Sequence, residues 1–360
     1  MRDREVIALA AALFPLGRLL WRAGRGPPGR AGKEFLEGLG REELKEVAQF
    51  QLLLDGWEAF ETSVSDEKYL KMGKAIMRAA SVLGNCSDTS PGEPMVSVFT
   101  LVDIGSGEPR HLYYKPIELD LSKELPVPGE KEEIPPEQYA SILKTLEYYL
   151  RHEDFHIDTS RVLGLIERFL TFVPACTSRP AVSFYDYSRL LSALAVAIYV
   201  AESEGNGEKP FLFVEGDLSG IQRFIFRITS KGALKMLRAR SIYLDLLSWD
   251  VVIEILNRLG LPRSCVLYNG GGAFTLIVPN TQENVKALKS LRDELERFLL
   301  RNFDGQLYLA IEWEEVSLEE MESFRDGRLW SDLKAKVGER KSRRFLDVID
   351  YFVDPKGYEK

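Results

Sequence analysis

Two carboxylates and a run of glycines are the residues of this sequence best suited to chemistry. Glu215 and Asp217 lie two positions apart in the apolar run 211–217, which is typical of a buried strand, so their side chains share one face of it. The run GGGAF at 270–274 has the form of a Gly-Gly-acid-acid-Phe hairpin tip, with glycine and alanine in the acidic places. Carboxylates at a strand end and at a hairpin tip would together hold two divalent ions against a triphosphate. Here only the strand end keeps them, so the pattern predicts a nucleotidyl-transfer centre without its catalytic metals.

The segments around these residues predict a small antiparallel sheet. A strand within 211–222 is followed by two helical patterns, two strand runs within 264–279, an amphipathic helix over about 281–302 and a strand over 307–316. The order β, α, β, β, α, β is typical of the ferredoxin-like arrangement, which is the palm of many nucleotidyl-transferring proteins. The predicted fold class is therefore α+β, with a ferredoxin-like palm, similar to that of nucleotidyl cyclases, over 209–318.

Small and basic residues close to Asp217 favour contact with a nucleotide. Ser219 occupies the position where a second carboxylate would be useful, and three successive glycines let a ligand approach the backbone more closely than a turn requires. Lys231 and Arg240 precede a long helix expected over 242–259, whose amino terminus also favours phosphate. Two plainer interpretations stay open: the glycines serve only a hairpin that needs positive φ, and Arg240 pairs with carboxylates in a subunit interface. The predicted nucleotide-binding residues are Asp217, Ser219, Gly220, Lys231, Arg240, Gly270, Gly271 and Gly272.

The palm region resembles a known family. The stretch FVEGDLSGIQRFIFRITSKGALKMLRARSIYLDLL at 213–247 and YNGGGAF at 268–274 are similar to the first of two palm domains in the large subunit of type III-A CRISPR–Cas effector complexes. The resemblance implies that a second palm carries a Gly-Gly-Asp-Asp tip, and that the two palms face each other and make cyclic oligoadenylates from ATP. It also implies that ATP, with Mg, binds only in an assembled two-palm site. The implied partners are the other subunits of the complex, its guide RNA and a second palm-bearing chain or segment.

The amino-terminal region, helical from about 2 to 85, corresponds in the resembled family to an HD nuclease domain. The family's first helix ends in a His-Asp pair, followed by Gly-Lys and Arg-Ala-Gly, and the pair holds metal for cutting single-stranded DNA. Here Phe14 and Pro15 stand in place of the pair, and Ser81 stands in place of a later Asp. An aromatic ring and an imino acid cannot ligate a metal. The resemblance therefore implies a degenerate HD-like domain that keeps its helical shape and binds no metal.

The rest of the chain divides by composition. The turn-forming run 85–93 ends the first region, two alternating runs at 95–103 and 109–119 predict a hairpin, and the Pro-, Glu- and Lys-rich 121–137 is typical of a linker. Helices are expected over 41–60, 66–84, 137–151, 158–173 and 185–204. The predicted domains are a degenerate helical HD-like domain at 1–90, a hairpin and linker at 91–136, a helical segment packing on the HD-like domain at 137–208, the ferredoxin-like palm at 209–318, and a charged helical tail at 319–360 that leads toward a second half.

Composition bounds the class of protein. The chain of 360 residues is 45% hydrophobic and 28% charged, which is typical of a soluble globular protein of two or three domains. A formal net charge of −8 argues against a surface that coats nucleic acid. Cys86, Cys176 and Cys265 are far apart and form no Cys-x-x-Cys pair, so neither a zinc site nor a disulfide framework is expected.

The apolar run 6–21 favours a first core helix over a signal peptide or a membrane anchor. Pro15 and Arg18 interrupt it, and no small-residue cleavage site follows. We therefore expect a cytoplasmic protein that does not associate with membranes.

Two polar clusters are more simply interpreted as solvent-exposed surface than as functional sites. His152 and His156 could share a helix face as metal ligands, but the sequence places no third ligand, and RHEDFHID at 151–158 is typical of a solvated helix end. The basic run LKAKVGERKSRRF at 333–345 could face RNA or a neighbouring subunit. A plain charged helix within a mostly solvated segment, 319–344, is the simpler interpretation.

Three functions stay open. The first is part of a type III CRISPR–Cas large subunit, inactive by itself, which supplies one wall of a nucleotide site and a scaffold for partner subunits and guide RNA. The second is a nucleotidyl cyclase or polymerase, against which the missing hairpin carboxylates argue. The third is a stand-alone regulatory nucleotide-binding module, which copurification with partner subunits would separate from the first. Because both sets of catalytic acids are missing, we expect the chain alone to be inactive.

Overall fold

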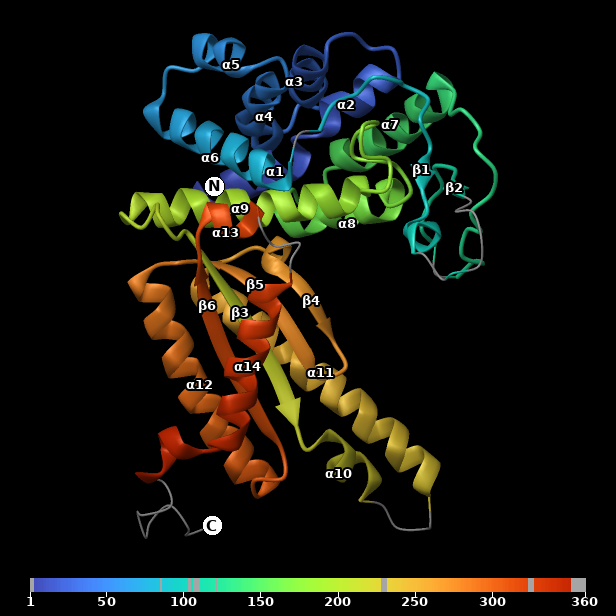
Figure 1. The fold of residues 1–360 in the computed structure, drawn as a ribbon. Helices are drawn as coiled ribbons and strands as arrows, with labels where there is room; N and C mark the ends of the chain where they lie inside the picture. Colours follow the sequence, from blue (N-terminus) through green and yellow to red (C-terminus); the bar gives the residue numbers. More distant parts are fainter. Residues whose placement is uncertain are drawn as a thin grey trace. The chain divides into compact units, whose positions relative to one another are not determined.

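The chain folds into two compact units, Met1–Tyr199 and Val200–Lys360 (Figure 1). The computed structural model describes residues 3–84, 86–102, 105, 111–120, 122–227, 232–322 and 327–350. The first unit is mainly helical with one two-stranded sheet, and the second is built on a four-stranded sheet. Both sheets are antiparallel, so the predicted mixture of helix and sheet is confirmed. Within the described ranges, no helix is long and apolar enough to cross a membrane.

The first unit packs its helices around α1, in which every residue from Val6 to Leu13 is buried. α1 contacts α4, α6 and α8, and the hydroxyl of Ser192 in α9 donates to the carbonyl of Ala8 at 2.9 Å. The helices are α1 Asp3–Leu13, α2 Leu16–Arg22, α3 Pro28–Gly38, α4 Glu42–Ala48, α5 Trp57–Ser63, α6 Glu67–Leu83, α7 Pro136–Arg151, α8 Thr159–Leu170 and α9 Phe184–Ser203.

Two expectations for this unit need correction. The helix expected over 41–60 is three elements, because a 3₁₀ segment, Gln49–Leu54, follows α4 and Gly56, with a φ of 116°, separates it from α5. The expected hairpin pairs only two residues on each strand, β1 Met95–Val96 with β2 Tyr113–Tyr114. Residues 103–104 and 106–110, which the expected hairpin included, lie outside the described residues.

The expected first core helix is two helices, because Pro15 interrupts it. Proline has no N–H to donate, so the helical hydrogen bonds cannot run through it. The fully buried side chain of Gln51 spans the break. Its amide nitrogen donates to the carbonyl of Leu13 at 2.8 Å, and its oxygen accepts from the N–H of Gly17 at 3.1 Å. One residue from a distant helix thus pairs both backbone groups that the break would leave unpaired.

The expectation of no disulfide is wrong. Cys86, which follows α6, and Cys176, which precedes α9, are joined with an S–S distance of 2.05 Å. They are 90 residues apart in the sequence, so the packing of the unit brings them together and no local spacing signals it. Cys265 is a free, buried thiol.

The second unit is an antiparallel sheet in the strand order β4-β5-β3-β6. The element order begins β3, α10, α11, β4, β5, α12, β6, in agreement with the strand and helix pattern of the sequence. The bounds are β3 Phe211–Ser219, α10 Ile221–Phe226, α11 Ala233–Leu259, β4 Val266–Gly270, β5 Ala273–Pro279, α12 Gln282–Phe303, β6 Tyr308–Val316, α13 Leu318–Glu322 and α14 Arg328–Ser342.

The central strands β3 and β5 are buried on both faces, which explains their nearly continuous apolar sequence. α11 packs on β4 and β5, α12 packs on β6, and α14 packs on β3 and β6. Figure 1 shows α14 in front of the sheet and α11 behind it. Leu333 and Val337 of α14 are buried, and the ring of Trp330 lies 6.2 Å from that of Phe213. The segment expected to be mostly solvated, 319–344, therefore contains a helix that covers one face of the sheet.

Candidate functional site

The hairpin tip between β4 and β5 lies against the end of β3. The N–H of Leu218 donates to the carbonyl of Gly272 at 2.8 Å. β3 was expected to end at Asp217, but it continues through Ser219. The structure therefore brings together two predicted groups of residues, which we call the nucleotide wall: Ser219–Gly220 and Gly270–Gly272.

Two of the glycines in the nucleotide wall have structural reasons of their own. Gly220 and Gly272 have φ values of 92° and 84°, in the left-handed region that favours glycine. A Cβ on Gly220 would lie 1.9 Å from the carbonyl oxygen of Gln306, and one on Gly272 would lie 2.4 Å from Cδ1 of Ile221. Gly271 also has positive φ, 63°, but no described atom lies within 4 Å of the Cβ position. Gly271 is therefore the point of the wall where a ligand has room to approach the backbone.

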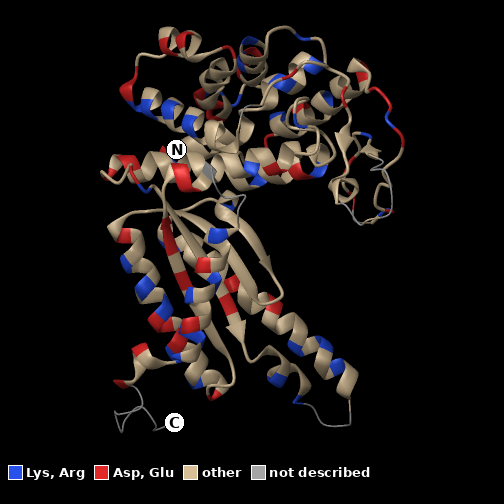
Figure 2. Cartoon of the chain, in the orientation of Figure 1, with Lys and Arg blue, Asp and Glu red and all other residues tan. Residues whose placement is uncertain are grey.

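The two carboxylates of β3 face α14. Figure 2 shows the acidic residues of β3 and β6 beside basic residues of α14. The Nζ of Lys341 lies 2.5 Å from Oδ2 of Asp217, so this carboxylate has a counter-ion from its own chain. Glu215 is 7% exposed, and its Oε2 has no hydrogen-bond partner among the described residues. Burial raises the pKa of the Glu215 carboxyl, and the charge of Lys334 opposes that shift.

The basic residues predicted to contact phosphate are placed differently from the expectation. α11 begins at Ala233 and not near 242, so Arg240 lies inside the helix. Its Nη1 donates to the carbonyls of Phe224 and Arg227 at 2.5 and 2.6 Å, and its guanidinium lies 5.2 Å from the centre of the Phe224 ring. These contacts fix Arg240 to the carboxyl end of α10. Lys231 lies outside the described residues.

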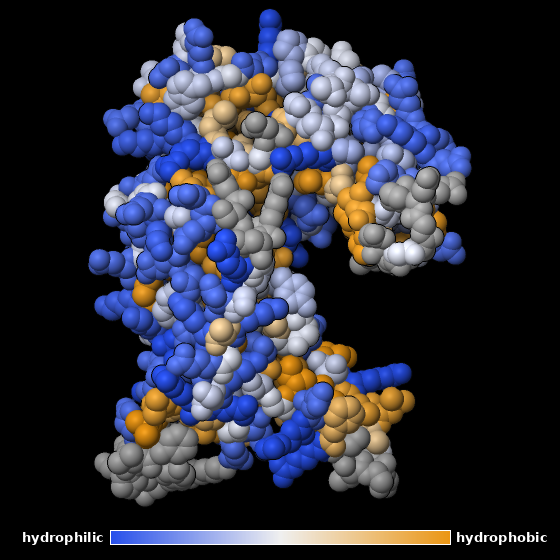
Figure 3. Space-filling view, in the orientation of Figure 1, coloured by the Kyte–Doolittle hydropathy of each residue, from blue (hydrophilic) through white to orange (hydrophobic). Residues whose placement is uncertain are grey.

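A large apolar surface on α11 was missed in the sequence. No residue from Ala233 to Tyr243 is buried, and Figure 3 shows hydrophobic side chains exposed over this region. One signal in the sequence could have predicted this surface: apolar residues occur on all sides of the helix, which is typical of a helix that other segments cover on all sides. The members of this α11 surface are between 42% and 64% exposed: Leu234, Met236, Ile242, Tyr243 and Leu246.

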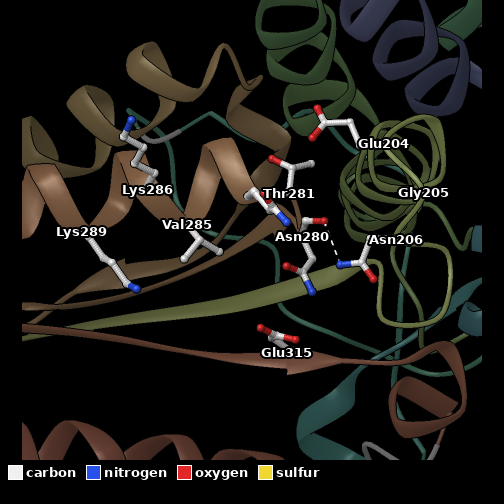
Figure 4. A pocket seen from close by; sticks show the side chains of 10 residues that line it. Glu204, Gly205, Asn206, Asn280, Thr281, Val285, Lys286, Lys289 and Glu315 are labelled. Atoms are coloured by element: carbon white, nitrogen blue, oxygen red, sulfur yellow. Dashed lines mark hydrogen bonds between the residues drawn. The ribbon is translucent and has the colours of Figure 1, made fainter.

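A pocket of about 900 Å³ lies at the other end of the sheet (Figure 4). It is next to the last residue of β5, Pro279, which pairs with the first residue of β3, whereas the hairpin tip is next to the last residues of β3. Basic and acidic side chains both line it, so it has no clear preference for an anion. The charged residues of its lining are Glu204, Lys286, Lys289 and Glu315. The pocket is therefore separate from the nucleotide wall.

The positions expected to correspond to the metal ligands of an HD domain carry no ligand side chains in the structure. Phe14 is 3% exposed and belongs to the core, Pro15 directly precedes α2, and Ser81 is an exposed residue of α6. His152 ends α7 and His156 lies in the loop that follows, so they do not share a helix face. In the part of the chain that the structure describes, no group of three or more His, Cys, Asp or Glu side chains could hold a metal ion.

Comparisons with known proteins give one consistent answer. A family model described as Csm1 subunit domain B matches residues 210–356. The single-strand-specific deoxyribonuclease Cas10/Csm1 (subtype III-A) of Thermococcus onnurineus is 36% identical over 393 residues, which cover 98% of this chain and 49% of that protein.

Solved structures agree with the sequence comparison. A Csm1–Csm4 cassette in complex with AMPPNP matches with a TM-score of 0.83 and 35% identity, over 99% of this chain and 51% of the other. A Csm1–Csm4 cassette in complex with cA4 matches with a TM-score of 0.82 and 35% identity over the same shares. The chain spans about half the length of these relatives.

Proposed function

We propose that the chain is the amino-terminal part of the large subunit of a type III-A CRISPR–Cas effector complex, because it is similar over 98% of its length to a Cas10/Csm1 protein of subtype III-A and its second unit matches the Csm1 domain B model. Its second unit is the non-catalytic palm that forms half of an ATP site for the synthesis of cyclic oligoadenylates. The chain also provides a scaffold for the other subunits, of which Csm4 is the one present in the solved relatives, and for the guide RNA they bind. The proposal places the protein in the cytoplasm, where such a complex works.

The sheet of the second unit supports its interpretation as a ferredoxin-like palm. The strand order β4-β5-β3-β6, with α10 and α11 joining β3 to β4 and α12 joining β5 to β6, is that of a split β-α-β arrangement. α14 packs on this sheet, so we extend the palm from the predicted 209–318 to Ser342. The first unit, in this proposal, is the degenerate HD-like domain with the hairpin and helical segments that follow it.

One observation carries the proposal: the nucleotide wall is assembled, but the acids that would make it catalytic are missing. The hairpin tip has Gly272 and Ala273 where two carboxylates would hold metal, and Asp217 is paired with Lys341. Magnesium for a triphosphate must then be held by another segment, because in-line displacement at phosphorus needs that charge compensation. In the proposal, the second palm supplies the carboxylates that hold magnesium, and this chain supplies the backbone surface against which the nucleotide binds.

The α11 surface supports the presence of a second palm or another partner segment. Five large apolar side chains that project from one helix into water are costly, and contiguous exposed apolar surface marks sites of protein contact. The hydroxyl of Ser248 in α11 donates to Oδ1 of Asn269, next to the hairpin tip, at 2.6 Å, so a partner that covers the α11 surface would lie close to the nucleotide wall.

Calorimetry with ATP and Mg tests the proposal. Compared with a complete two-palm site, a half-site buries less of the ATP molecule and pairs fewer of its charges. We therefore expect the chain alone to bind ATP with a dissociation constant near 1 mM, which is a binding free energy of about −4 kcal/mol. The affinity should be higher with a second-palm segment present. Gly271→Val should weaken binding by the pair, because the side chain fills the open position. Gly40→Val is a matched control, since Gly40 also has positive φ, 76°, and no atom within 4 Å of its Cβ position.

Equal weakening by both glycine variants would indicate general strain and not a ligand at the wall. Unchanged ATP affinity in Gly271→Val and in Ser219→Leu would show that the nucleotide wall is only scaffold and that its glycines serve the turn.

A further inference from the structure

Two arginines meet a single carboxylate in the interior of the first unit. Arg22 is 1% exposed; its Nη1 donates to the carbonyl of Pro174 at 2.6 Å, and its Nη2 donates to Oδ1 of Asp88 at 2.7 Å. Arg18, one turn earlier on α2, has its Nη1 3.8 Å from Oδ2 of Asp88. Oδ1 of Asp88 also accepts from the N–H of Thr177 at 3.0 Å. The group therefore carries two positive charges against one negative charge.

Three donors of this group have no hydrogen-bond partner among the described residues: Nη1 of Arg18, Nε of Arg22 and the hydroxyl of Tyr139. Tyr139 is fully buried, and its ring centre lies 6.0 Å from the Arg22 guanidinium. Buried polar groups are nearly always hydrogen-bonded, and buried charges are nearly always paired. Unpaired donors beside an excess of positive charge are complementary to an anion, since a water molecule could accept hydrogen bonds there but could not balance the charge.

The surrounding residues do not neutralise the excess charge. Burial lowers the pKa of the Arg18 guanidinium, although Tyr187 and Asp88 act to raise it. The same Tyr187, whose pKa burial raises, is influenced by the charges of both Arg18 and Arg179, so a third arginine lies near this group. Burial raises the pKa of Tyr139, and a second carboxylate, Glu93, contributes to this rise, but Glu93 is paired with Lys131 at 2.7 Å.

The small exposed edge of the cluster of Arg18, Arg22 and Asp88 limits the size of a ligand. The side chains of Arg18 and Asp88 are 11% and 10% exposed, so the group reaches the surface only at its edge. A guanidinium fork binds phosphate oxygens through short, charge-assisted hydrogen bonds. We propose that Arg18, Arg22 and Tyr139 form a binding site for a small oxyanion, either inorganic phosphate or the terminal phosphate of a nucleotide.

Titration calorimetry of the whole chain with inorganic phosphate tests this site. We expect Arg18→Gln to weaken phosphate binding about tenfold or more, because a hydrogen bond to a charged group contributes ~1.5–3 kcal/mol and 1.4 kcal/mol corresponds to tenfold. Tyr139→Phe should weaken binding to a smaller extent, since it removes one hydroxyl and keeps the aromatic ring beside Arg22. Arg30→Gln is the control, because Arg30 is a surface arginine, 77% exposed and paired with Glu34.

A parallel titration with ATP distinguishes the two sources of the oxyanion. ATP binding that Arg18→Gln weakens assigns the site to a terminal phosphate, whereas an effect on inorganic phosphate alone assigns it to the free ion. The proposal is overturned if the wild-type chain binds no phosphate at millimolar concentration, or if Arg18→Gln and Tyr139→Phe both bind it as tightly as the wild type. Should Arg18→Gln fail to fold, Tyr139→Phe alone decides, because it keeps the shape of the core.

Discussion

Lys341 gives a physical reason for the presence of carboxylates on β3. An isolated buried carboxylate is costly, and its cost falls when a cation lies beside it. Asp217 has the ammonium of Lys341 at 2.5 Å, and Glu215 is influenced by the charges of Lys334 and Lys341. Asp217 thus helps to dock α14 on the sheet, whereas the buried charge of Glu215 is only partly compensated.

Replacing Glu215 by glutamine should make the protein more stable at neutral pH. Burial raises the folded-state pKa of Glu215, so its contribution to stability is present below the unfolded pKa of about 4.3 and is lost as the pH rises through the folded value. Glutamine has no charge to bury. The difference in Tm between Glu215→Gln and wild type should therefore be positive at about pH 8 and shrink toward about pH 4. The exposed Glu319→Gln is the control, and an equal gain at both pH values would rule out burial as the cause.

The candidate site was predictable from the sequence only where local geometry decides it. The period of a strand places Glu215 and Asp217 on one face, and a short hairpin brings Gly272 next to β3. Lys341 was not predictable, because the ion pair joins residues far apart in the sequence through the docking of a helix. The same holds for Arg240, whose partners are backbone carbonyls that no sequence pattern reveals.

At the level of elements, the starts of three helices of the first unit were predicted closely. α7, α8 and α9 begin within one residue of the expected 137, 158 and 185, and Asp158 caps α8 by accepting from the N–H of Arg161. The errors occur where tertiary contacts decide. The start of α11 was placed too late because its exposed first turns lack a buried stripe, and α14 was read as solvated because only two of its residues face the sheet fully.

Replacing Gln51 by leucine should weaken the joint between α1 and α2. The variant leaves the carbonyl of Leu13 and the N–H of Gly17 buried without partners. Each unsatisfied buried group costs ~1–3 kcal/mol, so we expect a loss of about 3 kcal/mol in the free energy of unfolding, measured in urea. Gln49→Leu is the matched control, because that half-buried side chain donates only to the carbonyl of Glu46, and it should cost less than about 1 kcal/mol. Equal losses in the two variants would contradict a bridging role for Gln51.

At the scale of the molecule, the disulfide between Cys86 and Cys176 closes a loop that makes up nearly half of the first unit. In the chain-entropy model a cross-link over 90 residues stabilises the folded state by roughly 4–5 kcal/mol. Reduction, or the Cys86→Ser and Cys176→Ser pair, should therefore lower the Tm of the first unit by several degrees. Cys265→Ser is a control for loss of a thiol. A Tm that does not respond to reductant would mean that the two thiols are unpaired in solution.

In the proposed function, the whole chain is one half of a catalytic assembly. It contributes the nucleotide wall and the α11 surface, and a second palm contributes the acidic hairpin tip. The disulfide, the joint between α1 and α2 and the four-stranded sheet stabilise this half. None of these features provides ligands for the metal ions that the reaction needs.

The proposed role as the non-catalytic half of a two-palm site is tested most directly by the synthesis of oligoadenylate from ATP and Mg. The product is measured for the chain alone and for the chain mixed with a second-palm segment. We expect no product from the chain alone, because Gly272 and Ala273 cannot coordinate metal, and we expect product from the mixture. Product formed by the chain alone and abolished by Asp217→Ala would contradict the proposal and show that the active centre lies within this chain.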